Sequence, residues 1–180
     1  MPFSSSIFDD DMGKIVALLQ PATVCDIGPG AGKYARIVRN VANEHQFTSH
    51  LTAVEIDDSY VSRFDLRSLY DTVIIGDATN LMKNPQCRFD LVIFGDCIEH
   101  LKKSDGIDLL NFLIYRSGYI CIIYPDSYVQ DDWEGHAAEA HISVWGPQDF
   151  SGWEVLHRTR SKMHLFVIKG YQPSRVPLGV

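Results

Sequence analysis

The stretch TVCDIGPGAGKY at residues 23–34 is the most informative segment of the chain. An apolar run reaches Asp26, and Gly28, Gly30 and Gly32 then lead directly into a segment with helical periodicity. Glycine suits a backbone that turns tightly or approaches a ligand closely. The amides at a helix N-terminus favour an anionic group. The stretch therefore predicts a strand, a glycine-rich turn that binds a ligand, and a helix.

Two other nucleotide-binding motifs do not match this spacing. A P-loop has four residues between its glycines and Ser or Thr after its lysine. Here three residues separate Gly28 from Gly32, and Tyr34 follows Lys33. The dinucleotide fingerprint is G-x-G-x-x-G, whereas this turn has the spacing G-x-G-x-G. A plain glycine-rich turn without a ligand stays open as the alternative.

Strand-like and helix-like segments alternate along the chain. Five segments have the apolar content and length of strands: 23–27, 51–56, 71–75, 88–94 and 119–124. Between or before them lie segments with helical periodicity: 11–20, 32–44, 59–70 and 103–115. Two further strands, 153–160 and 163–169, are expected to form a hairpin near Ser161. This order predicts a doubly wound α/β fold with a mostly parallel seven-stranded sheet and an antiparallel C-terminal hairpin.

Composition favours a single globular domain. The chain has 180 residues, and we expect one domain over 1–170 followed by a loosely ordered tail over 171–180. Its formal net charge of −7 makes nucleic acid an unlikely partner, because phosphate-backbone binding needs clustered Lys and Arg. No apolar run is long enough for a membrane span. The four cysteines form no CxxC pair, which favours a reducing cytoplasm.

Polar residues follow the second and third predicted strands. Ligands of such sheets bind at the carboxyl ends of the strands. Glu55 is placed to accept both hydroxyls of a ribose. Asp57 is the alternative carboxylate for this role, although the pattern favours a solvated acid at that position. Asp77, in Gly76-Asp77-Ala78, is placed to accept from an adenine amino group, with the next backbone amide donating to the ring. Gly-Asp is also common in ordinary turns. The interpretation of Asp77 as an adenine contact therefore depends on the candidate residues at the ends of the first two strands.

The segment GDCIEHL, residues 95–101, follows the fourth predicted strand. Its polar residues begin abruptly after a fully apolar run, as expected for a site at a sheet edge. Asp96 is expected to line a bound cofactor or to reach the acceptor. Glu99 and His100 either belong to the site or begin the next helix, and the pattern favours neither.

Taken together, DIGPGAG, the acid that ends the second strand, GDA and DCIEHL resemble the class I S-adenosylmethionine-dependent methyltransferases over about residues 20–125. The DxIEHL form is most similar to enzymes of the quinone-biosynthesis type, which act on small molecules. No Asn/Asp-Pro-Pro-aromatic sequence of the nucleic-acid amino methyltransferases is present. The resemblance implies the cofactor S-adenosyl-L-methionine, the product S-adenosyl-L-homocysteine, and these cofactor-binding residues: Asp26, Gly28, Gly30, Gly32, Glu55, Ile56, Asp77, Ala78, Asp96 and Cys97.

The segment 125–146 leaves from the expected ligand side of the sheet and is interpreted as a lid over the acceptor. It holds four candidates for a base, Tyr128, His136, Glu139 and His141, of which Tyr128 and His141 are predicted to be catalytic together with Asp96. His141 is the first choice as general base, and a histidine that only pins the loop is the alternative. The run His136-x-x-Glu139-x-His141 lacks the HExxH spacing, so no metal site is predicted.

The sequence thus predicts an enzyme that transfers a methyl group directly to a small-molecule acceptor, with an O, N or C acceptor atom. The alternative is a non-catalytic S-adenosylmethionine-binding module that works through a partner protein. A nicotinamide oxidoreductase is disfavoured by the glycine spacing and by Asp77. The oligomeric state is left open, a homodimer included.

Overall fold

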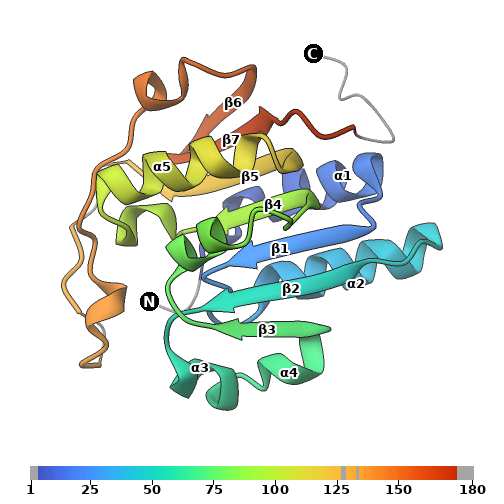
Figure 1. The fold of residues 1–180 in the computed structure, drawn as a ribbon, viewed down its shortest axis with the longest axis horizontal. Helices are drawn as coiled ribbons and strands as arrows, with labels where there is room; N and C mark the ends of the chain where they lie inside the picture. The colour runs from blue at the N-terminus through green and yellow to red at the C-terminus, as the bar shows by residue number, and fades with distance from the viewer. Residues whose placement is uncertain (1–3, 127–128, 133, 174–180) are drawn as a thin grey trace.

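The computed structural model describes residues 4–126, 129–132 and 134–173. Seven strands form one sheet in the order β3-β2-β1-β4-β5-β7-β6 (Figure 1). Their bounds are β1 Thr23–Ile27, β2 His50–Glu55, β3 Thr72–Ile75, β4 Phe89–Gly95, β5 Ser117–Pro125, β6 Val155–Arg160 and β7 Met163–Lys169. The first five strands are parallel, and β7 pairs antiparallel with both β5 and β6. The predicted fold class is confirmed.

Among the described residues, five α-helices connect or precede the strands: α1 Asp9–Leu19, α2 Lys33–His45, α3 Asp58–Arg63, α4 Leu66–Leu69 and α5 Lys103–Ile114. The single helix expected over 59–70 is wrong. Asp65 adopts a left-handed conformation with φ 48°, which interrupts the helical hydrogen bonding and separates α3 from α4. Short 3-10 turns cover Ser6–Phe8, Ala78–Lys83, Ile98–His100, Ala137–Glu139 and Pro147–Phe150.

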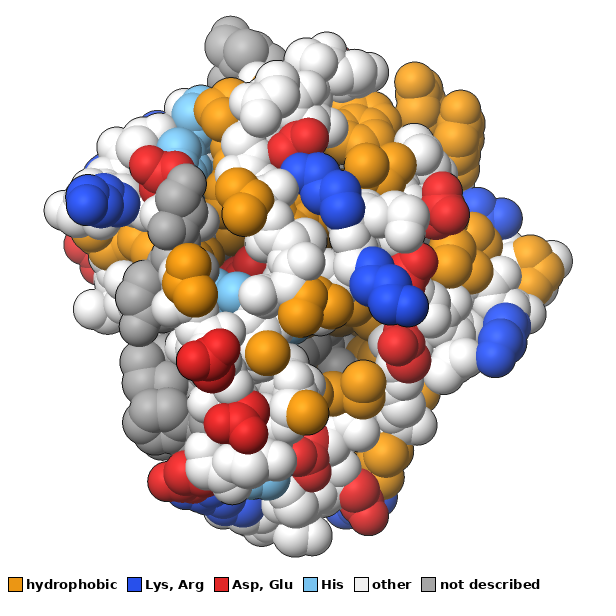
Figure 2. Space-filling view, turned by 90° about the vertical axis from the view of Figure 1, so that its left-hand side faces the viewer, with side chains coloured by type: hydrophobic (Ala, Val, Ile, Leu, Met, Phe, Trp, Pro, Cys, Tyr) orange, Lys and Arg blue, Asp and Glu red, His pale blue; other side chains and the backbone are white. Residues whose placement is uncertain are grey.

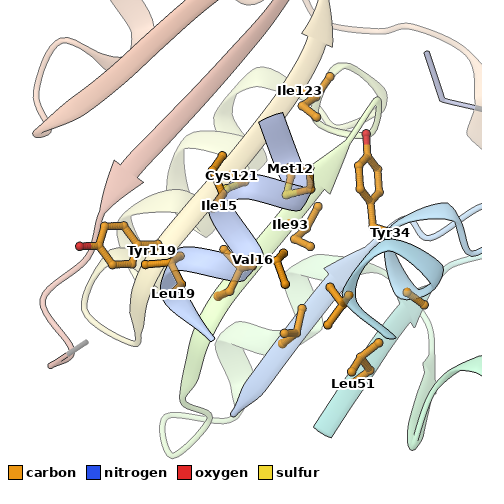
Figure 3. Packing of buried hydrophobic residues seen from close by; sticks show 14 of the residues in the cluster. Met12, Ile15, Val16, Leu19, Tyr34, Leu51, Ile93, Tyr119, Cys121 and Ile123 are labelled. Atoms are coloured by element: carbon orange, nitrogen blue, oxygen red, sulfur yellow. The ribbon is translucent and has the colours of Figure 1, made fainter. Parts of the chain in front are cut away.

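Two buried clusters cover the two faces of the sheet. On one face, α1 directs Met12, Ile15 and Val16 onto the central strands, and α2 adds Tyr34 (Figure 3). On the other face, α5 packs the side chains of Leu109 and its neighbours against β4 and β5. In β4, the run from Leu91 to Phe94 is completely buried, as a strand covered on both faces requires.

The C-terminal hairpin turns at Ser161 and Lys162, which both have positive φ (45° and 65°), as in the two-residue turns that match strand twist. Arg158 and Arg160, on β6, both donate to the buried carboxylate of Asp11 on α1, and the Arg158 Nη1 to Asp11 Oδ1 distance is 2.6 Å. The hairpin and the first helix are therefore joined by ion pairs across the edge of the fold.

The expected tail begins with ordered contacts. The backbone N–H of Tyr171 donates to Ile114 at 2.8 Å, and that of Gln172 donates to Ser117 at 3.1 Å. The Tyr171 ring stacks on Tyr115. Residues 174–180 of the expected tail lie outside the described residues. Across the described part of the chain, none of the helices combines the length and the apolar character that crossing a membrane requires.

Candidate cofactor and acceptor site

A cavity of 270 Å³ opens at the carboxyl edge of the sheet. Crossover connections leave β1 and β4 for opposite faces of the sheet, so this edge is the point where ligands of doubly wound sheets bind. Figure 2 views the molecule from this side, where acidic and apolar side chains are interspersed. Eight of the predicted cofactor residues line the cavity: Gly28, Gly30, Glu55, Ile56, Asp77, Ala78, Asp96 and Cys97.

The glycine-rich turn is packed tightly against the loop after β4. Gly28 has φ +66°, and a Cβ at that position would lie 2.6 Å from Cys97 Sγ. The Gly28 N–H donates to Val54 at 3.0 Å, which ties the turn to β2. Gly32 is the N-cap of α2 and has a left-handed conformation. The turn therefore has the tight, side-chain-free backbone that the sequence predicts.

Glu55 ends β2 as a carboxylate that is only 4% exposed and lines the cavity. Its Oε1 accepts from the Asp57 N–H at 2.9 Å, and burial raises the pKa of Glu55 to about 7. A carboxylate at this position has the acceptor geometry that a pair of ribose hydroxyls needs. Ile56, next in the chain, is 54% exposed and offers the cavity an apolar side chain.

Asp57 is not the solvated acid that the sequence suggested. It caps α3 by accepting from the Ser59 N–H at 2.9 Å, and it also accepts from His136 Nδ1 at 2.5 Å. The hydrogen bond from the Ser59 side chain, followed by the His136 contact, lowers the pKa of Asp57. His136 also packs on Tyr60, with ring centroids 4.9 Å apart. Asp57 thus fastens the segment after β5 to the end of β2.

Asp77 lines the cavity and begins the 3-10 turn over Ala78–Lys83. Its Oδ1 accepts from the Thr79 N–H at 2.7 Å and from the Thr79 hydroxyl at 2.6 Å. One carboxylate oxygen is therefore committed to the turn, which fixes the direction of the side chain. Ala78 is buried beside it.

Asp26 and Gly32 are not among the residues that line the cavity. Asp26 is 2% exposed, and the hydroxyl of Tyr70 donates to its Oδ2 at 2.5 Å. Burial raises the pKa of Asp26 to about 7. The part of Asp26 in cofactor binding stays a prediction.

A second cavity of 350 Å³ adjoins the first, and Asp96 and His100 line both. Asp96 has φ 51°, an uncommon conformation for a residue with a Cβ, and its Oδ2 accepts from the Ser5 N–H at 3.1 Å. Burial raises the pKa of Asp96 to about 6. Asp96 thus lies at the boundary between a cofactor cavity and a neighbouring chamber, where a reacting centre is expected.

His141 lines the second cavity together with Glu99 and Gln130. Its Nε2 lies 3.9 Å from Glu99 Oε1, and its ring packs edge-on against His100. The His141 backbone N–H donates to Gln130 at 2.9 Å, so the residue also pins its loop. Tyr128 lies outside the described residues. The histidines of the predicted lid are separated, because His136 joins the end of β2 whereas His141 joins the segment after β4.

Sequence reasoning did not assign Glu99 and His100 to the site. Both belong to the 3-10 turn Ile98–His100, which ends before α5 begins at Lys103. Glu99 is 3% exposed, and burial, with the Asp96 carboxylate, raises its pKa well above the ordinary value. The pair Glu99-His100 shortly after an apolar strand was the only signal. The N-terminal residues Ser4 and Ser5, which cover Asp96, gave no signal at all.

The strand order, the glycine turn and the strand-end carboxylates together define a Rossmann-like methyltransferase fold. A family model described as "Methyltransferase domain" matches residues 10–156, and the chain belongs to this family. Among curated proteins, no sequence matches the chain.

Solved structures share the fold at low sequence identity. An O-methyltransferase family protein from Burkholderia thailandensis has a TM-score of 0.65 and 13% identity over 91% of this chain, which spans only 55% of that protein. A SAM dependent methyltransferase from Archaeoglobus fulgidus has a TM-score of 0.65 and 15% identity, with 91% of this chain and 93% of that one covered. The N-terminal domain of EvdMO1 with SAH bound has a TM-score of 0.63 and 16% identity, with 93% and 83% covered.

Proposed function

We propose that the protein transfers the methyl group of S-adenosyl-L-methionine to a small-molecule acceptor, within a single domain over residues 1–170. One observation carries the proposal: a cavity with the cofactor-binding pattern adjoins a second chamber, and Asp96 and His100 line both. A donor and an acceptor can thereby be held side by side, which is the main requirement of direct transfer.

The residues present fit the cofactor. The turn at Gly28 leaves no room for a Cβ, Glu55 presents a buried carboxylate, and Asp77 and Ala78 follow the next strand along the sheet edge. When bound, S-adenosylmethionine supplies an electrophilic methyl group on its sulfonium. Similar structures were solved with SAH or SAM bound, among them the EvdMO1 domain and human N-acetylserotonin methyltransferase.

The second chamber carries the groups that act on an acceptor. Asp96 faces both chambers and is placed to orient the acceptor against the methyl group. A hydroxyl acceptor must also lose its proton as its oxygen forms the new bond to carbon, and His141 is placed to receive that proton. The O–H bond breaks as the O–C bond forms, and the S–C bond breaks toward sulfur.

The remaining expectations follow from composition. The net charge of −7 favours a small acceptor over nucleic acid. Cys25, Cys87, Cys97 and Cys121 are all free thiols, which supports a reducing compartment such as the cytoplasm. Nothing in the fold favours the non-catalytic module over the enzyme, and a homodimer stays compatible with both.

The test is calorimetric titration with S-adenosylhomocysteine, with NAD as the control ligand. We expect saturable binding of S-adenosylhomocysteine alone, and loss of that binding in Glu55→Ala. Glu44→Ala, an exposed glutamate on α2, is the matched control and should bind as the wild type does. Binding of NAD, or equal binding by Glu55→Ala, would overturn the cofactor assignment. Methyl transfer in an acceptor screen then separates an enzyme from a binding module.

A further inference from the structure

The carboxylate of Glu99 is the most unusual polar group in the described part of the chain. The residue is 3% exposed, and neither Oε1 nor Oε2 accepts a hydrogen bond from any described residue. A buried carboxylate in that situation is costly, because the protein replaces none of the water that it loses. Buried charged groups in proteins are paired with an opposite charge or coordinate a metal ion.

Two histidines lie beside this carboxylate. Glu99, His100 and His141 each place a ligand atom within 4.8 Å of the other two, and His141 Nε2 lies 3.9 Å from Glu99 Oε1. Ligands about 2.0–2.2 Å from one ion lie up to about 4 Å apart, so small side-chain rotations suffice to bring all three onto a common centre.

Hydrogen bonds orient the cluster in the way that is usual for histidine ligands of metals. The Nδ1–H of His100 donates to the Ala140 carbonyl at 3.0 Å, which fixes the ring and leaves the Nε2 lone pair for a ligand. The N–H groups of Ile142 and Ser143 both donate to the Glu99 carbonyl, at 3.0 and 3.1 Å. The backbones that carry the cluster are therefore fastened to each other next to the side chains that would bind.

We propose that Glu99, His100 and His141 bind a divalent transition-metal ion at the wall of the second cavity. Two imidazoles and one carboxylate suit Zn²⁺, Mn²⁺ or Fe²⁺, whereas Mg²⁺ and Ca²⁺ prefer oxygen ligands alone. Three protein ligands leave coordination positions open, and all three residues line the cavity. These open positions face the chamber assigned to the acceptor.

This site deepens the proposed function and rests on it for its role. An acceptor hydroxyl bound at an open position would be acidified by the ion, and its proton would pass to solvent water before the oxygen takes the methyl group. His141 is then a ligand, because an imidazole that coordinates through Nε2 has no lone pair there for a proton. The acceptor class would be molecules with a hydroxyl, and preferably a second neighbouring oxygen that binds the same ion.

Direct metal titration tests the site without any methyl acceptor. Protein freed of metal with EDTA is titrated with Co²⁺, whose visible absorption reports coordination by nitrogen and oxygen, and with Zn²⁺ in competition. We expect one equivalent to bind to the wild type. Glu99→Gln and His141→Ala should each weaken binding by more than the roughly 10- to 100-fold that loss of a mere supporting contact costs. His136→Ala, a histidine of the same segment outside the cluster, is the matched control and should bind as the wild type does.

Three results would overturn the site: no Co²⁺ or Zn²⁺ binding to the wild type, equal binding by Glu99→Gln, or tighter binding of Mg²⁺ than of Zn²⁺. S-adenosylhomocysteine titration of the same variants shows whether they are folded. Glu99→Gln should keep wild-type affinity for it, so failure of the metal site and failure of the cofactor assignment give different results. If a variant binds neither ligand, His100→Asn, which changes the third ligand, provides the decisive measurement.

Discussion

The cofactor side and the acceptor side of the carboxyl edge are built in different ways. On the cofactor side, Gly28, Glu55 and Asp77 each lie within two residues of the end of their own strand. On the acceptor side, His100 meets the Ala140 carbonyl across 40 residues of chain, and Ser143 meets the Glu99 carbonyl across 44. The first arrangement follows from the strands themselves. The second requires a long segment to fold back over the sheet edge.

The largest expected effect belongs to the acceptor side. His141→Ala should lower turnover by about 10²- to 10⁴-fold with an acceptor found by screening, because removal of the acceptor's proton depends on His141, either as the base or as a ligand of the proposed ion. Affinity for S-adenosylhomocysteine should change less than about twofold, since His141 lines only the second cavity. Steady-state kinetics and calorimetry measure the two. Unchanged turnover would mean that His141 only pins its loop.

The next effect belongs to the cofactor side. Gly28→Ala should weaken S-adenosylhomocysteine binding by about 100-fold, because strain at φ +66° and a 2.6 Å approach to Cys97 Sγ must displace the turn. Gly152→Ala, where a Cβ meets nothing within 4 Å, is the control. Calorimetry compares the two variants. If both variants bind S-adenosylhomocysteine equally well, the glycine-rich turn can accommodate a Cβ, and the idea of a rigid cofactor side is wrong.

A smaller effect is expected from pH. The pKa of Glu55 is raised to about 7 in the free protein, and the ribose hydroxyls need the ionised carboxylate as acceptor. Affinity for S-adenosylhomocysteine should therefore fall by about tenfold as the pH is lowered from 8 to 6. Protonation of Asp96, whose pKa is about 6, is expected at the lower end of this range. Glu55→Gln should lose most of the dependence in calorimetric titrations, and a wild-type affinity that is flat with pH would contradict the assignment.

The smallest effect is expected for the ion pairs between Asp11 and the arginines of β6, which belong to neither the cofactor side nor the acceptor side. Arg160→Ala should lower the free energy of unfolding by about 1 kcal/mol, since Asp11 keeps Arg158 and the arginines are partly exposed to solvent. Urea unfolding measures it, and Arg67→Ala, an exposed arginine on α4, is the control. If the free energy of unfolding falls by the same amount in Arg160→Ala as in Arg67→Ala, the ion pair between Arg160 and Asp11 adds nothing to stability.

The same contrast explains what the sequence could predict. The bounds predicted for the strands around TVCDIGPGAGKY are confirmed within one or two residues. Hydrophobic periodicity, glycines and buried apolar runs are all local signals in the sequence. The break at Asp65 was missed, because a left-handed aspartate inside a helical pattern leaves no mark in the pattern. Eight of the ten predicted cofactor residues line the first cavity, since parallel strands bring their carboxyl ends together whatever the loops do.

The acceptor side was predicted only in outline. His141 was selected, yet its neighbours Glu99 and His100 were left between a site and a helix start. Their contact depends on backbone bonds from Ile142 and Ser143 to Glu99, and neither residue carries a motif. Asp57 was assigned to solvent, because its partner His136 lies 79 residues away. Pairings across such separations cannot be read from periodicity or spacing.

The ion pairs between Asp11 and the two arginines also bear on how the protein is made. Arg158 lies 147 residues after its partner, so the first helix leaves the ribosome long before the groups that neutralise its buried carboxylate exist. A domain generally folds as a unit, so these ion pairs form only after the C-terminal hairpin has been synthesised. Ser161, Lys162 and Met163 at the turn of that hairpin also line the second cavity, and this wall of the chamber is therefore among the last parts of the protein to be made.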